Sequence, residues 1–231
     1  MREQFNWRWL QCHEAELAYR VHAEAIVDQS FGLVRPDDLS HFIAHTGTSG
    51  AIIGCFTLKG MMVAYGVLGT NSATHSHLAS LLSIEQKDRG RFAILDGVAA
   101  LPNWRGNGLH RESIRLRRVQ ALSLGCNLIG ATVAPDNILS LRGLLAEQFR
   151  VREFAMLYGG MTRLILECDV SVVESQWIHV RSVDLNNQIA HTAALSQGLI
   201  GYACSQTDSQ IWQLHYGRQN LPVSPAGGSS L

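Results

Sequence analysis

Residues 93–137 decide the fold, and they read AILDGVAALPNWRGNGLHRESIRLRRVQALSLGCNLIGATVAPDN. The run from Ala93 to Leu101 is apolar enough for a buried strand, and Pro102 ends it. A helix is expected from Gly108 to about Ser123, and a second strand from Asn127 to Val133. This order of strand, glycine turn, basic helix and strand indicates an α/β protein.

The turn before the helix predicts an anion site. Gly106 and Gly108 let the backbone approach a ligand, and a helix start offers free N–H groups and partial positive charge, so a phosphate fits there. Arg105 and Arg111 add charge, whereas residues 115–118 are interpreted as a solvated helix face. A Gly-x-Gly turn is also common as a plain connection, which stays open as the alternative.

Two standard phosphate motifs do not match this turn. No Gly-Lys-Ser/Thr sequence follows, which excludes a P-loop. A dinucleotide-binding turn would place a third glycine where Arg111 stands.

The same residues resemble the central signature of the GNAT family of N-acetyltransferases, Gln/Arg-x-x-Gly-x-Gly/Ala after a strand that ends in an apolar-x-Pro step. Ala100-Leu101-Pro102 followed by Arg105 to His110 is similar to it, although His110 replaces the last small residue. Asn137 and Phe149 continue the resemblance, which covers about residues 45–168. Gln148 departs from it by replacing the family's glycine.

The resemblance implies a mixed α/β fold of the α+β type, with a mostly antiparallel central sheet flanked by helices. Residues 1–170 are expected to form this domain, 171–218 a small helix and hairpin appendage, and 219–231 a flexible tail.

Patterning predicts the remaining elements. Two helices are expected before the sheet, and a polar insertion from Ser72 to Arg91 is interpreted either as a lid or substrate wall or as a solvated excursion. The expected helices are 14–29, 36–45, 138–148 and 185–197, with a short helical run at 78–82, and the further strands are 50–57, 61–67, 151–157, 161–168, 199–203 and 210–216.

The resemblance implies transfer of an acetyl group from acetyl-coenzyme A to a primary amine within a ternary complex. It assigns oxyanion contacts to backbone groups of the central strand and pyrophosphate contacts to the turn, while Asn137 and Ser140 touch the coenzyme arm. The residues implied to bind the cofactor are Val98, Ala99, Ala100, Arg105, Gly106, Asn107, Gly108, Leu109, His110, Arg111, Asn137 and Ser140.

Two catalytic residues are expected. Asp96 is the candidate base because strand alternation places it on the face of Val98, although an aspartate before glycine also shapes bulges. The family's tyrosine acid is replaced by Leu144. Tyr158 or His110 serves instead, or the thiolate leaves unaided.

Composition indicates which kinds of partner are disfavoured and which cellular compartment is expected. Nineteen basic and nineteen acidic residues give zero net charge, which disfavours nucleic acid and anionic membranes as partners. Five widely spaced cysteines without a Cys-x-x-Cys pair predict reduced thiols in the cytoplasm. No apolar signal core or membrane span is found in the sequence.

No metal site is predicted. His75 and His77 lack further ligands at the expected spacing. His41 and His45 lie one helical turn apart, which suits a metal, but surface or capping positions are preferred because no Glu-x-x pattern accompanies them.

Other functions remain open at this stage. The chain is alternatively a coenzyme A binding protein without transferase activity, with a regulatory or interaction role, or a different small-anion binder with the same turn. The acceptor amine, small-molecule or peptide, is not specified by the sequence. The C-terminal extension either covers the cleft or pairs with a second subunit in a homodimer.

Overall fold

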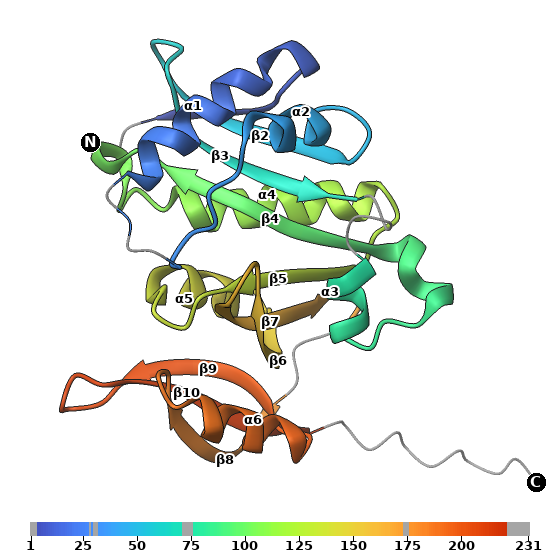
Figure 1. The fold of residues 1–231 in the computed structure, drawn as a ribbon, viewed down its shortest axis with the longest axis vertical. Helices are drawn as coiled ribbons and strands as arrows, with labels where there is room; N and C mark the ends of the chain where they lie inside the picture. The colour runs from blue at the N-terminus through green and yellow to red at the C-terminus, as the bar shows by residue number, and fades with distance from the viewer. Residues whose placement is uncertain (1–3, 28, 30–31, 71–75, 173–175, 221–231) are drawn as a thin grey trace, which may run out of the picture.

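The computed structural model describes residues 4–27, 29, 32–70, 76–172 and 176–220. These residues form one ten-stranded sheet (Figure 1). β4 and β5 pair in parallel, and the other neighbouring strands pair antiparallel. The strand order is β1 (Phe5–Trp9), β2 (Gly50–Thr57), β3 (Met62–Gly69), β4 (Phe92–Ala100), β5 (Leu128–Val133), β7 (Met161–Asp169), β6 (Arg150–Leu157), β9 (Ile200–Gln206), β10 (Trp212–Asn220) and β8 (Gln176–Asp184).

Helices cover both faces of the sheet (Figure 1). α1 (Ala15–Ile26) and α2 (Leu39–His45) pack on β2 and β3 around the fully buried Phe42. α4 (Leu109–Ser123) covers the other face and contacts α5 (Ile138–Ala146). The mixed, mostly antiparallel sheet flanked by helices confirms the predicted fold class.

The described part of the expected insertion, residues 76–91, packs on the sheet. α3 (Ser76–Leu81) is followed by a 3-10 turn over Gln86–Arg91. Leu78 and Ile84 are buried against Phe92 at the start of β4. Apolar burial therefore holds this segment on the sheet. His75 lies outside the described residues, and His77 is exposed.

Two strands differ from the sequence prediction. β1 precedes both N-terminal helices and pairs with β2, so the expectation that these helices come before the whole sheet is wrong. β8 adds a strand to the C-terminal extension ahead of α6 (Gln188–Ser196). The predicted helix and hairpin of the extension are confirmed, and residues 221–231 of the expected tail lie outside the described residues.

The extension repeats the second half of the main domain. β10 lies between β8 and β9 as β7 lies between β5 and β6. The Asn187 side chain caps α6 by accepting a hydrogen bond from the Ala190 N–H at 3.1 Å, as Asn137 caps α5 by accepting from the Ser140 N–H at 3.2 Å. The two units meet where β6 and β9 pair at Val151 and Gly201.

Candidate active site

The central strands separate at the middle of the sheet. Pairing between β4 and β5 runs from Phe92–Leu128 to Leu95–Ala131 and ends there, although β4 continues to Ala100. Figure 1 shows the two strands diverging toward their carboxyl ends. Opposite β3, Gly66 and Leu68 pair with Val98 and Leu95, so β4 carries one extra residue at Asp96 and Gly97. The predicted bulge is therefore present, and it redirects the strand where the wedge opens.

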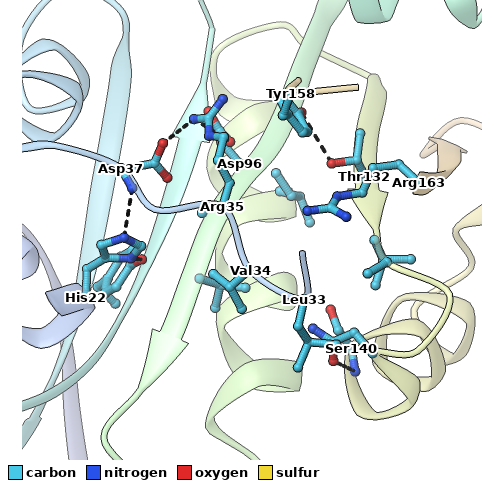
Figure 2. A pocket seen from close by; sticks show the side chains of 17 residues that line it. His22, Leu33, Val34, Arg35, Asp37, Asp96, Thr132, Ser140, Tyr158 and Arg163 are labelled. Carbon is cyan, nitrogen blue, oxygen red and sulfur yellow. Dashed lines mark hydrogen bonds and ion pairs between the residues drawn. The ribbon is translucent and has the colours of Figure 1, made fainter. Parts of the chain in front are cut away.

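A cavity of about 100 Å³ lies in this wedge (Figure 2). β4, β5, the start of α5 and the turn after β6 contribute to its walls. Five residues singled out in the sequence line it together: Asp96, Val98, Asn137, Ser140 and Tyr158. Ala99, Ala100 and the glycine turn lie outside this cavity's lining.

The glycine turn has the predicted geometry. Gly106 and Gly108 adopt φ of 82° and 76°, and a Cβ at either position would meet open space. Gly108 is the N-cap of α4, and none of the described side chains caps this helix. The first N–H groups of the helix have no partner within it, so they are available to an anion.

The arginines near the glycine turn make contacts within the protein. Arg105, which precedes α4, donates to the Ala25 carbonyl at 2.8 Å, and Arg111, in the first turn of α4, pairs with Glu147 at 2.5 Å. Arg117 is only 1% exposed and donates to the Val67 carbonyl at 2.9 Å. The interpretation of residues 115–118 as a solvated face is therefore wrong for Arg117, which braces α4 against the sheet.

The start of α5 brings Asn137 and Ser140 to the cavity. The side-chain oxygen of Asn137 caps the helix by accepting from the Ser140 N–H, and Asn137 also lines the cavity. The Ser140 hydroxyl lies 3.2 Å from Nε2 of His110. Burial, with a smaller effect from Arg117, lowers the pKa of His110 to about 4, so this imidazole is neutral at pH 7. A neutral His110 joins the first turns of the two helices.

Asp96 lies among charged and titratable groups at the cavity wall. Its Oδ1 is 4.0 Å from Arg35, and its Oδ2 is 3.9 Å from Nε2 of His45. Arg35 also pairs with Asp37 at 2.5 Å. His45 is only 6% exposed, and its Nδ1 lies 2.8 Å from the His41 carbonyl oxygen at the end of α2, so of the two expected positions it takes the capping one and not the surface one. Burial also lowers the pKa of its neighbour His41.

Tyr158 occupies the opposite wall in a strained conformation. Its φ is 51°, in the left-handed region that non-glycine residues rarely adopt. Its hydroxyl lies 3.4 Å from that of Thr132, and its ring packs against the guanidinium groups of Arg35 and Arg163 (Figure 2). Leu144, at the family's tyrosine position, is 4% exposed in the core.

A segment between α1 and α2 crosses the cavity. Leu33, Val34 and Arg35 line the cavity, and Arg163 donates to the Gly32 carbonyl at 2.7 Å. At its other end the Asp37 N–H donates to Nε2 of His22 at 3.0 Å. Residues 32–37, the crossing segment, are thus held at both ends.

Sequence reasoning missed the crossing segment and Arg163. Arg35, Asp37 and Arg163 belong to no local pattern, and only the fold brings them to the central strand. A signal for His41 and His45 did exist, because their one-turn spacing was noted.

Comparison with solved structures identifies similar folds. A Salmonella typhimurium protein solved with its cofactor acetyl-CoA is 12% identical, with a TM-score of 0.55 over 75% of this chain and 98% of that one. The diaminobutyrate acetyltransferase of Paenibacillus lautus, in complex with its substrate and coenzyme A, is 12% identical, with a TM-score of 0.53 over 74% and 99%. The polyamine N-acetyltransferase of Drosophila melanogaster is 13% identical, with a TM-score of 0.54 over 72% and 100%.

These likenesses establish the fold. No protein-family model matches the chain, and no curated protein matches it in sequence. Among the described residues, none of the helices has the length and apolar character needed to cross a membrane.

Proposed function

We propose that this chain, whose fold is that of the GNAT-type N-acetyltransferases, transfers an acetyl group from acetyl-coenzyme A to a primary amine. The observation that carries the proposal is the wedge between β4 and β5, which lies beside an uncapped glycine turn. A long ligand with a phosphate group at one end and a reactive group at the other suits this arrangement.

In this proposal the turn from Arg105 to Arg111 binds the pyrophosphate mainly through backbone N–H groups. Asn137 and Ser140 contact the coenzyme arm from the start of α5. Beyond the last β4–β5 pair, backbone groups of Val98, Ala99 and Ala100 hydrogen-bond the arm and the thioester oxygen. Because most of these contacts are made by the backbone, the arginines of α4 are free to serve packing.

The reaction proceeds by direct attack. An alkylammonium has a pKa of about 10.4, so Asp96 accepts its proton, directly or through water. The amine nitrogen then bonds to the thioester carbon, the carbon–sulfur bond breaks, and the thiolate leaves with the electron pair. Tyr158 donates a proton to that thiolate. Positioning supplies most of the rate, and no metal takes part.

The cavity favours a small acceptor or the narrow end of a larger one. Its charged lining is balanced, with Arg35 and Arg163 against Asp37 and Asp96. The two neighbours named above for their amine substrates act on small molecules. We also place the protein in the cytoplasm, on the cysteine argument alone, since all five thiols are free.

The first test is calorimetric titration with acetyl-coenzyme A. We expect Gly106→Ala and Gly108→Ala to weaken binding at least tenfold, because a methyl group would block the phosphate approach. Gly60→Ala and Gly125→Ala are matched controls, since both glycines have φ near that of Gly106 and open space around them. Equal affinity in all four variants, or no binding by the parent chain, would reject the coenzyme site.

Turnover separates an enzyme from a binding protein. The buried Leu144 at the family's tyrosine position favours the alternative of a coenzyme A binding protein with a regulatory role. We expect acetylation of small primary amines by the parent chain, and a loss of at least a hundredfold in kcat for Asp96→Asn with coenzyme affinity kept. Tight binding without turnover over a broad amine panel would support the alternative.

A further inference from the structure

Behind the cavity wall, two histidines of α2 face the carboxylate of Asp96. His41 and His45 lie one turn apart, and their rings are 4.3 Å apart between centroids. One ligand atom from each histidine and one carboxylate oxygen of Asp96 all lie within 4.8 Å of one another. Three groups that bind metals thus converge from two elements that are distant in the sequence.

Hydrogen bonding orients the imidazole of His45. Its Nδ1 lies 2.8 Å from the His41 carbonyl oxygen, and because a carbonyl only accepts, this nitrogen carries the proton. Its Nε2 therefore presents a lone pair, directed toward Oδ2 of Asp96 at 3.9 Å. A second hydrogen bond that fixes the tautomer in this way is the usual support of a metal-binding histidine.

His41 is held less closely. Its Nδ1 lies 3.9 Å from Oδ1 of Asp37, which is beyond hydrogen-bond distance. Its Nε2 is buried and has no hydrogen-bond partner in the described part of the chain. A buried nitrogen left without a partner is costly, and a bound cation would remove that cost.

The local charge also favours a cation. Asp37 and Asp96 carry two negative charges, and Arg35, which contacts Oδ1 of Asp96, carries one positive charge. The cluster therefore has a net formal charge of −1 when both imidazoles are neutral. The Arg35 guanidinium lies beside Oδ1 of Asp96, whereas Oδ2 lies on the side of His45.

We propose that His41, His45 and Asp96 form a site for a divalent transition-metal ion of the zinc type. Two imidazole nitrogens with one carboxylate oxygen suit zinc rather than magnesium or calcium, which prefer oxygen ligands. Tetrahedral zinc holds its ligand atoms about 3.3 Å apart, so binding requires the three side chains to close by about 1.5 Å at most. Three protein ligands leave a fourth position for water.

Occupation of this site has a functional consequence that rests on the proposed function. The ion takes the Asp96 oxygen that would accept the proton of the amine. Zinc is therefore an inhibitor of the transfer, competing with the amine and not with acetyl-coenzyme A. Binding of the ion does not itself depend on any activity of the chain.

The test is titration of the chelator-treated full-length protein with Zn²⁺ by calorimetry and with Co²⁺ by visible absorption. We expect one ion per chain and the intense absorption bands of tetrahedral cobalt. His41→Ala and His45→Ala should each lower the affinity at least tenfold, and so should the nearly isosteric Asp96→Asn. His179→Ala is the matched control, since His179 has another histidine ring 5.6 Å away in the C-terminal unit but no carboxylate in that pair.

Circular dichroism and thermal melting check that each variant is folded, and Asp96→Asn keeps the test usable if a histidine variant is not. Absence of stoichiometric binding would overturn the proposal. So would unchanged affinity in the folded variants, or a loss of binding in His179→Ala. Because these measurements involve no acetyl transfer, failure of the proposed function would leave the zinc result interpretable.

Discussion

Among single residues, Tyr158 combines backbone strain with a place on the cavity wall. Strain of this kind costs about 1 to 3 kcal/mol and is retained where the surroundings impose it. The ring contacts with Arg35 and Arg163 fix the side chain, so its hydroxyl stays beside Thr132.

If Tyr158 protonates the leaving thiolate, Tyr158→Phe should lower kcat by about a hundredfold while the KM for acetyl-coenzyme A stays unchanged. Steady-state kinetics measures this. Thr132→Val is the control, because it removes the neighbouring hydroxyl and keeps the phenol. A parent-like kcat in Tyr158→Phe would mean that the thiolate leaves unaided.

Glu14 governs part of the acid stability. Hydrogen bonds from Arg8 and from the Gln11 N–H lower the pKa of Glu14 to about 2. A carboxyl with a lowered pKa stabilises the fold above its unfolded pKa of about 4.3, and this contribution is lost as the pH falls toward 2.

Glu14→Gln should therefore lower the free energy of unfolding at pH 7 by about 1 kcal/mol, since Arg8 is half-exposed and partly screened. It should also flatten the loss of stability between about pH 4 and pH 2. Urea unfolding at several pH values measures both effects. Glu16→Gln, which breaks the exposed pair with Arg20, serves as the control and should change neither.

At the scale of elements, the two capped helices allow function to be separated from stability. Asn137→Ala and Asn187→Ala should each lower the free energy of unfolding by about 1 kcal/mol, because each removes one cap. Only Asn137→Ala should also weaken acetyl-coenzyme A binding. Denaturation and calorimetry on both variants test this, and equal binding losses would remove Asn137 from the coenzyme site.

The elements that the sequence predicted correctly have strong local signals. β4 is an apolar run closed by Pro102, and α4 begins at a glycine turn. β1 has only five residues. Its exposed residues, Asn6 and Arg8, alternate with partly buried aromatic residues, but the pattern is too short to stand out. β8 leaves the apolar Ile178 and Val180 exposed, so its burial does not follow a simple alternation in the sequence. β1 and β8 are strands because they pair with β2 and β10, and this long-range pairing is not visible in the local sequence.

The candidate site shows the same difference between residues with local sequence signals and residues placed by long-range contacts. Residue type and spacing predicted the glycine turn and Asp96, and Asn137 was predicted from the resemblance to the GNAT signature. The crossing segment at 32–37 was not, because its place over the cavity depends on Arg163, more than 120 residues later in the chain. Bulge geometry likewise arises from the pairing of β4 with β3, although Asp96-Gly97 hinted at it.

For the whole molecule, the joint between the two units consists of the β6–β9 pair and the packing of α5 on β9 and of α6 on β6. A Cβ on Gly201 would lie 2.8 Å from that of Val151 and 3.0 Å from Leu214. Gly201→Ala should therefore lower the free energy of unfolding by about 1 to 3 kcal/mol. Thermal melting tests this against Gly90→Ala, where the added methyl group meets open space. Equal melting temperatures would mean that the joint yields without cost.

The early end of the β4–β5 pairing has a consequence for the life of the protein in the cell. On the proposed function, acetyl-coenzyme A supplies hydrogen bonds that the sheet lacks at its centre, so the occupied chain is harder to unfold. At a hundred times its dissociation constant a ligand contributes about 2.7 kcal/mol. Quality-control proteases act on unfolded chains, so supply of the metabolite sets abundance as well as rate, and a cell short of acetyl groups keeps less of this protein.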